Sequence, residues 1–321
     1  MNIWGFIQNK LKDNKRIILL IVVESNGSSP GRQGFKMAVA ENSEIFGSIG
    51  GGIMEYAMVE KAKKLFAQQE FLPFIKKQIH NKKSPDNQSG MICSGEQSIL
   101  FYPINPATQD AELVTDIVAC LQKNCKNILS VLPLGMTLGT SAKLAERYRT
   151  KITNETDWEY REQIAYKNEL YIIGGGHVSV ALSQTMAQLG FYVTVFDNRE
   201  SLNTMEMNTY AHNKQIINYA QIEKYIPKGE NVYVVIMTFQ HISDQKVLQS
   251  LIHGKFKYIG LMGSKSKVQK LFAGLKAEGI TDEKLAKVHS PIGISIKSET
   301  PEEIAISIAA EIISVKNKKT S

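Results

Sequence analysis

Three consecutive glycines, Gly174–Gly176, follow the apolar run Leu170–Ile173 and precede a predicted apolar helix. A strand-to-helix turn without side chains lets a phosphate approach the amides at the helix N-terminus, where the helix dipole also favours an anion. Asp197 lies 23 residues after Gly174, at the end of the next predicted strand, where a carboxylate can accept hydrogen bonds from ribose or similar hydroxyls. Ser179 stands at the third glycine position of the G-x-G-x-x-G pattern, so the match is partial. This context favours phosphate binding at Gly174, Gly175 and Gly176 over a turn that only permits close helix–strand packing.

A second glycine-rich segment, Gly47–Gly52, precedes the predicted helix Met54–Phe66. Successive glycines lose much backbone entropy on ordering, so close approach of a ligand or another chain is one reason for them. The other interpretation is the exit of a hairpin, with Glu55 balancing the helix dipole from the first turn. Both interpretations stay open, and the candidate contacts are Ser48, Gly50, Gly51, Gly52 and Glu55.

Three histidines, His177, His241 and His289, follow predicted strand ends. In a doubly wound sheet, ligands collect at the carboxyl edge of the strands. An isolated loop histidine is usually ordinary surface, but three at one edge favour a pocket in which each can donate to a phosphate or other ligand oxygen. Asp244 either orients His241 or caps the next helix, and capping is the favoured interpretation.

The elements that position these residues predict an α/β protein of two halves. The first hundred or so residues mix helix and strand patterns, whereas Lys151–Gln163 is polar and shows no apolar period. From Glu169 onward strands and helices alternate, which is typical of a parallel, doubly wound sheet. We therefore expect an N-terminal α/β domain at residues 1–110, a connecting segment at 111–168 and a Rossmann-like C-terminal domain at 169–321.

The composition excludes several classes of protein. In 321 residues, 38 Lys and Arg oppose 31 Asp and Glu, but the basic residues are scattered, which favours solvated surface over a nucleic-acid site. No apolar run is as long as the roughly 18 residues that a membrane helix needs. The early apolar run Ile17–Val23 is not followed by a signal-peptide cleavage pattern. Cys93, Cys120 and Cys125 are too few for a disulfide framework and lack zinc-site spacing. We expect a cytoplasmic protein with reduced thiols and without a membrane, nucleic-acid or resident metal partner.

Ordered motifs run through nearly the whole chain. They are Gly27–Pro30, Gly47–Glu55 and Met91–Glu96 in the first half, and Gly174–Val178, Thr238–His241, Tyr258–Ser264, His289–Gly293 and Glu299–Ala305 in the second. Together they resemble the xanthine dehydrogenase accessory factor family (XdhC/CoxI). The resemblance implies a chaperone rather than a catalyst. Such a protein binds the molybdenum cofactor (molybdopterin), supports its sulfuration with a cysteine desulfurase and delivers it to a xanthine dehydrogenase-type molybdenum hydroxylase.

The same resemblance implies roles for further residues. It adds Gly263 and Ser264 to the cofactor-binding candidates and makes Cys93 the candidate catalytic residue, since a thiolate there can reach the molybdenum end or carry a persulfide sulfur. The alternative for Cys93 is a small buried residue, and core packing is favoured for Cys120 and Cys125. Family members often have Cys-Gly-Gly where this chain has Cys93-Ser94-Gly95.

Two other functions compete with this one. An NAD(P)-dependent oxidoreductase would use the Gly174 loop and Asp197, but the N-terminal half supplies no evident acid–base pair. A nucleotide-sensing regulatory module would use the C-terminal half as a ligand switch, yet no basic recognition helix indicates an effector. We expect a homo-oligomer, most simply a dimer. One ligand that contacts both glycine loops needs the two domains close together, and this can happen within one chain or between the two chains of a dimer.

Overall fold

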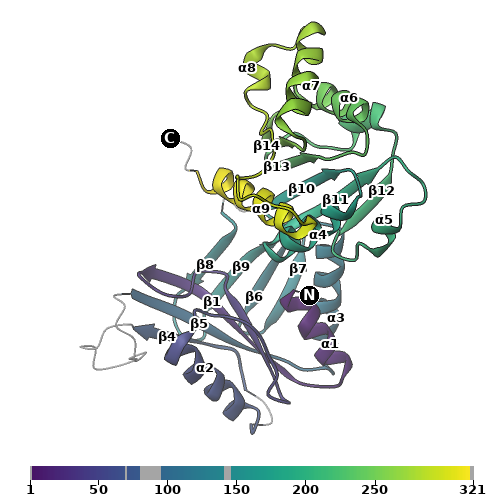
Figure 1. The fold of residues 1–321 in the computed structure, drawn as a ribbon. Coiled ribbons are helices and arrows are strands. Elements are labelled where there is room, and N and C mark those ends of the chain that lie inside the picture. The colour runs from purple at the N-terminus through teal and green to yellow at the C-terminus, as the bar shows by residue number, and fades with distance from the viewer. Residues whose placement is uncertain (1, 69–70, 80–94, 141–145, 319–321) are drawn as a thin grey trace. The chain divides into compact units, whose positions relative to one another are not determined.

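The computed structural model describes residues 2–68, 71–79, 95–140 and 146–318, and it separates into two compact units, Met1–Ala165 and Tyr166–Ser321 (Figure 1). The α/β class predicted from the sequence is confirmed. Within the described ranges, no helix is both long and apolar enough to cross a membrane.

Unit 1 contains two antiparallel sheets with three helices. Its elements are α1 (Ile3–Lys12), β1 (Ile17–Gly27), β2 (Lys36–Ala40), β3 (Ile45–Gly47), α2 (Gly52–Leu65), β4 (Phe74–Ile79), β5 (Gly95–Ile104), α3 (Gln109–Gln122), β6 (Asn127–Leu132), β7 (Gly135–Gly139), β8 (Tyr148–Ile152) and β9 (Trp158–Ile164). The strand orders are β3-β2-β1-β5-β4 and β7-β6-β9-β8. Most of α3 and the whole second sheet therefore lie within the predicted connecting segment, residues 111–168.

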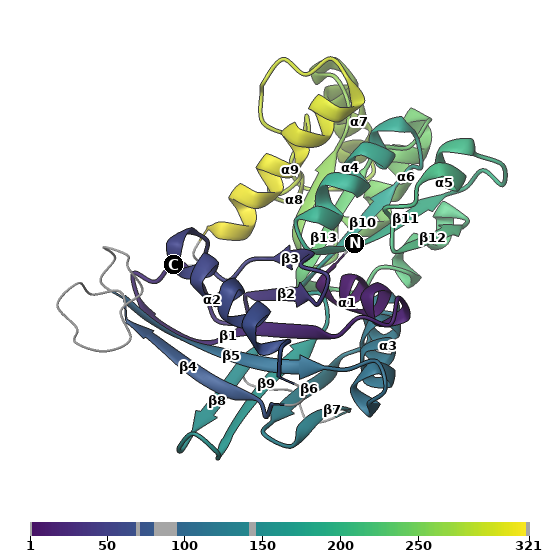
Figure 2. The same cartoon turned by 90° about the horizontal axis from the view of Figure 1, so that it is seen from below.

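Strand β1 is central in the first sheet and is buried on both faces. Its odd-numbered residues from Ile17 to Val23 pack in a core with α1 and α3, and Ile18, Leu20 and Val22 pack in another core with α2. Figure 2 shows α2 running along this sheet. Burial on both faces explains why β1 is a continuous apolar run rather than an alternating one.

The prediction that Lys151–Gln163 has no apolar period was wrong. Strand β9 buries alternate residues, namely Trp158, Tyr160, Glu162 and Ile164. Glu162 interrupts the apolar alternation because its buried carboxylate forms an ion pair with Lys36 across the two sheets. A charged residue at an inward position therefore concealed a regular strand.

Unit 2 is a five-stranded parallel sheet with helices on both faces. Its elements are β10 (Asn168–Ile173), α4 (His177–Gln188), β11 (Phe191–Asp197), α5 (Asn203–Met207), β12 (Asn213–Ile216), the 3₁₀ helix η1 (Tyr219–Lys224), β13 (Gly229–Ile236), α6 (His241–Leu251), β14 (Phe256–Leu261), α7 (Lys265–Ala277), α8 (Asp282–Leu285) and α9 (Pro301–Asn317). The order β12-β11-β10-β13-β14 and the parallel pairings confirm the Rossmann-like, doubly wound prediction.

The two faces of this sheet carry separate cores. Helices α4 and α9 pack on one face around Leu182, Ile308 and Ile312, and α6 and α7 pack on the other around Leu248 and Leu271. Strand β10 lies in the middle of the sheet, with β11 on one side and β13 on the other, so the strand order reverses there. The carboxyl end of β10 is therefore the topological switch point of the sheet.

Candidate functional site

The first glycine of the loop after β10 is required by close packing. Gly174 has φ +114°, and a Cβ there would lie 2.2 Å from the Met237 carbonyl oxygen. Its N–H donates to Phe196 O at 2.7 Å. The backbone after β10 therefore lies against the ends of both neighbouring strands, β11 and β13, and only glycine fits.

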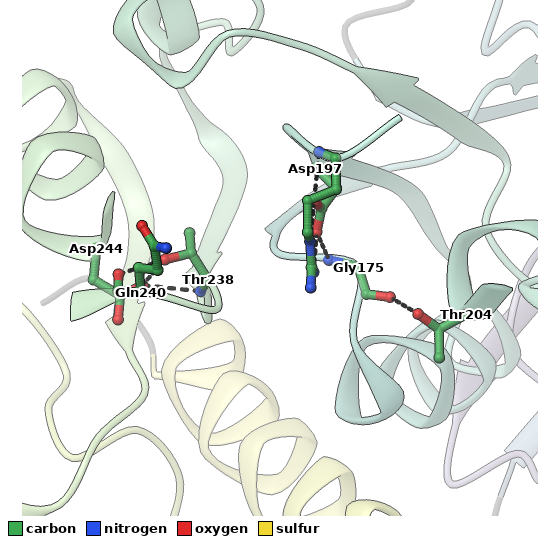
Figure 3. Close-up of polar contacts among 7 residues, drawn as sticks. Gly175, Asp197, Thr204, Thr238, Gln240 and Asp244 are labelled. Carbon is green, nitrogen blue, oxygen red and sulfur yellow. Dashed lines mark hydrogen bonds and ion pairs between the residues drawn. The ribbon is translucent and has the colours of Figure 1, made fainter. Parts of the chain in front are cut away.

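Gly175 is also fixed by contacts within the unit. Its N–H donates to Asp197 Oδ2 at 2.7 Å, and its carbonyl accepts from the Thr204 hydroxyl at 2.5 Å (Figure 3). A Cβ at Gly175 would lie 2.5 Å from Met205 Cγ. The amide of Gly175 is consequently used by the protein itself.

The third glycine differs from the first two because it is open. Gly176 has φ −72°, and a Cβ there would meet nothing within 4 Å. The N–H groups of Gly176, His177 and Val178 donate to no other residue in the described parts of the chain. They stand at the N-terminus of α4, with the exposed His177 as its first residue. Such amides, aided by the helix dipole, form a donor set for an anion.

Asp197 serves the chain's own donors. Its side chain is 1% exposed, and both oxygens accept hydrogen bonds: Oδ1 from the N–H and Nε–H of Arg199, and Oδ2 from Arg199 Nη2 and from Gly175. Burial opposes ionisation, but these donors outweigh it and hold the pKa of Asp197 below its ordinary value. A contact between Asp197 and ligand hydroxyls stays a prediction, and it requires displacement of Arg199.

Arg199 is a residue that the sequence reasoning missed. Asp197 holds two of its five N–H donors, so the opposite edge of the guanidinium is available. The guanidinium carbon lies 5.4 Å from the ring centroid of Phe239, which is 79% exposed in the turn after β13. The Asp-x-Arg spacing at the end of a predicted strand was the signal that could have identified Arg199.

The turn after β13 is held by a buried carboxylate. Asp244 Oδ1 accepts from the Thr238 N–H at 2.9 Å and from its hydroxyl at 2.6 Å (Figure 3). Lys267 Nζ lies 2.7 Å from the other oxygen, Oδ2. Helix α6 has no side-chain cap at Gln240. Asp244 therefore neither caps α6 as its N-cap residue nor contacts His241, and both interpretations from the sequence were wrong.

The remaining C-terminal candidates have individual settings. His241 is the half-buried first residue of α6. His289 pairs with Gly260 of β14, stacks on Tyr258 at 4.6 Å and lies 3.2 Å from a Glu311 oxygen. Ser264 caps α7, since its side chain accepts from the Lys267 N–H, and Gly263 precedes it. The structure thus gives His289 and Ser264 packing and capping roles, and ligand binding by these residues stays a prediction.

The glycine loop of unit 1 brings its predicted residues together around one carboxylate. Glu55 Oε2 accepts from the Ser48 hydroxyl at 2.7 Å and from the N–H groups of Ile49 and Gly51, both at 2.9 Å. Gly50 has φ +132°, and its Cβ would lie 2.6 Å from the Gly31 nitrogen. This loop therefore folds around the chain's own anion.

Gln97 joins this loop to the other N-terminal motifs. Its Oε1 accepts from the Ser29 hydroxyl at 2.6 Å and from the Gly31 N–H at 3.2 Å. A Cβ at Gly95 would lie 2.6 Å from the Ser29 nitrogen. Ser29, Ile49 and Gly95, one residue from each of three motifs, thus lie close together at one end of the first sheet. Cys93, the predicted catalytic residue, lies outside the described residues.

Comparison with known proteins identifies the family. Residues 170–312 match the XdhC Rossmann domain, and residues 11–74 match the XdhC and CoxI family. The chain belongs to the XdhC/CoxI family, as its motifs predicted.

Individual relatives support the assignment over the full length. The chain is 28% identical to the uncharacterized protein YqeB of Escherichia coli over 99% of its own residues, but it spans 47% of that curated relative. It is 24% identical to a protein of Bacillus subtilis named as a probable xanthine dehydrogenase component, covering 96% of each. A crystal structure described as a xanthine dehydrogenase from Bacillus halodurans shares the fold, with a TM-score of 0.70, 23% identity and coverage of 100% and 97%.

Proposed function

We propose that this protein binds the molybdenum cofactor as cargo and supports its sulfuration and insertion into a xanthine dehydrogenase-type molybdenum hydroxylase. Membership in the XdhC/CoxI family supports this class of function. The observation that carries the proposal is the set of N–H groups at Gly176, His177 and Val178, which have no acceptor among the described residues. Arg199 binds the same carboxylate, Asp197, as the adjoining Gly175 amide. This set suits the terminal phosphate of a molybdopterin-type molecule.

The chemistry of the site matches other parts of the same cargo. The exposed ring of Phe239 offers a flat apolar surface for a pterin, and the free edge of Arg199 offers further donors to an anion. Gly176 lets a phosphate approach the backbone, since no side chain stands in front of its amide. Gly174 and Gly175 shape the loop without contacting the phosphate.

Partners follow from this proposal. The cofactor arrives without its terminal sulfur, so a cysteine desulfurase supplies the sulfur and the hydroxylase receives the product. Cys93 is our candidate for the residue that carries the sulfur or binds the molybdenum end of the cofactor. We propose that the protein acts as a dimer in the cytoplasm. The protein would then act as a chaperone, with no turnover of its own.

A binding experiment tests the proposal. Purified protein is titrated with isolated molybdenum cofactor, and the bound fraction is measured by co-elution. We expect saturable binding that falls at least about tenfold in Gly176→Val, because the side chain covers the open amides. Gly139→Val is the matched control, since a Cβ at Gly139 also meets nothing within 4 Å. No binding to folded wild-type protein would overturn the proposal.

The oxidoreductase alternative is tested in parallel with NADH and NADPH. Its support from the sequence was the Gly174 loop together with Asp197, and both carboxylate oxygens of Asp197 already accept hydrogen bonds from Gly175 and Arg199. Stoichiometric binding of either dinucleotide together with turnover of a substrate would reverse our preference.

A further inference from the structure

A cavity of about 280 Å³ lies within unit 1 and shares no residue with either glycine loop. Trp4 and Leu121 form apolar parts of its wall, while Lys36, Arg147, Tyr148 and Glu162 contribute polar atoms. The cavity therefore combines an apolar surface with three charged side chains, which is a typical composition for a small-molecule site.

Two of these charges compensate each other. Lys36 Nζ lies 2.5 Å from Glu162 Oε2, and the side chains are only 8% and 6% exposed. Tyr160 donates to the same carboxylate oxygen at 3.1 Å, and Lys36 also donates to the Gly34 carbonyl. The pair is thus a fixed, neutral part of the wall.

The third charged side chain of the wall, Arg147, is not neutralised by the Lys36–Glu162 ion pair. Its Nη2 donates to the Ala165 carbonyl at 3.2 Å, but its buried Nε–H has no acceptor among the residues that the structure describes. No carboxylate of the described ranges forms an ion pair with Arg147. Protein atoms enclose Nε, so a ligand in the cavity can reach only the terminal edge of the guanidinium, formed by Nη1 and Nη2.

We propose that this cavity binds a small organic monocarboxylate. The carboxylate accepts from Arg147, since a guanidinium edge matches two carboxylate oxygens. The body of the ligand packs against Trp4 and Leu121. Because Lys36 and Glu162 neutralise each other, Arg147 gives the wall one net positive charge, which one carboxylate balances and a phosphate or dicarboxylate exceeds. This site is independent of cofactor binding at the Gly174 loop.

Benzoate and benzamide test the proposal on the intact wild-type protein, because they have the same shape and differ in charge. Calorimetric titration is expected to give saturable benzoate binding and at least about tenfold weaker benzamide binding. Equal binding of the two, or no benzoate binding to folded protein, would overturn the proposal.

Variants locate the binding. Arg147→Gln removes the positive charge and is expected to weaken benzoate binding at least about tenfold. Arg147→Lys keeps the charge but loses the planar donor edge, so it should weaken binding less. Arg149→Gln is the matched control, on an exposed residue of strand β8, which begins directly after Arg147, and it leaves affinity unchanged. Leu121→Trp narrows the cavity while keeping Arg147, so it also abolishes binding. Full affinity in folded Arg147→Gln or Leu121→Trp protein contradicts the assignment.

Discussion

The two glycine loops look alike in sequence but use their amides differently. In unit 1, Glu55 accepts hydrogen bonds from Ile49 and Gly51, so the loop encloses the chain's own carboxylate. In unit 2, the Gly175 amide is held by Asp197, while the N–H groups from Gly176 to Val178 have no acceptor among the described residues. Glycine content alone therefore does not distinguish the two loops, whereas the availability of their amides does, and it is the reason that we propose unit 2 for the phosphate.

The largest effect that we expect is a difference in stability between substitutions at Gly174, which is tightly packed, and at Gly176, which is open. Gly174→Ala places a Cβ 2.2 Å from Met237 O at a positive φ, so it should lower the free energy of unfolding by about 3 kcal/mol or more. The Cβ of Gly176→Ala has no atom within 4 Å, so this substitution should change the free energy of unfolding by less than about 0.5 kcal/mol. Urea unfolding of both variants measures the difference, and equal losses would contradict the assigned geometry.

Removing the internal anion of unit 1 should have a smaller effect. Glu55→Ala leaves the Ser48 hydroxyl and two amides without their acceptor, which should cost about 2 kcal/mol of unfolding free energy. Glu60→Ala, on the same helix, removes only a half-exposed ion pair with Lys63 and should cost about 0.5 kcal/mol or less. If both variants lose the same stability in thermal or urea unfolding, Glu55 does not organise the loop.

The smallest effect concerns the pH dependence of Asp197. Its folded-state pKa is lowered, so its contribution is present above the unfolded value of about 3.9 and is lost as pH falls through the folded value. The stability difference between wild type and Asp197→Asn should therefore shrink as pH falls below about 4. Urea unfolding at a series of pH values measures this. A difference that stays constant or grows on acidification would show that Asp197 is not held ionised by Arg199.

Much of the fold was predictable because its signals are local. The alternation of strands and helices after Glu169 predicted the parallel sheet, and the glycines after Ile173 predicted the turn at its switch point. In the second sheet of unit 1, strand β9 was missed, because Glu162 replaces an apolar residue at an inward position and its partner Lys36 is distant in sequence.

The places of the candidate residues in the fold were predictable, but their hydrogen bonds were not. Asp197 was expected at the strand end, yet its use by Arg199 and Gly175 depends on tertiary geometry that spacing does not contain. The same is true of Glu55, whose two interpretations the sequence left open. Asp244 was misread because a helix-start pattern does not show that its carboxylate holds Thr238 and Lys267.

The central claim is that the open amides of unit 2, and not the filled loop of unit 1, receive the phosphate of the cofactor. The most direct measurement is the affinity of isolated molybdenum cofactor for wild-type protein, Gly176→Val and Ser48→Ala, each shown to be folded. We predict at least about tenfold weaker binding for Gly176→Val and unchanged binding for Ser48→Ala. Loss of binding in Ser48→Ala with full affinity in Gly176→Val would contradict the claim.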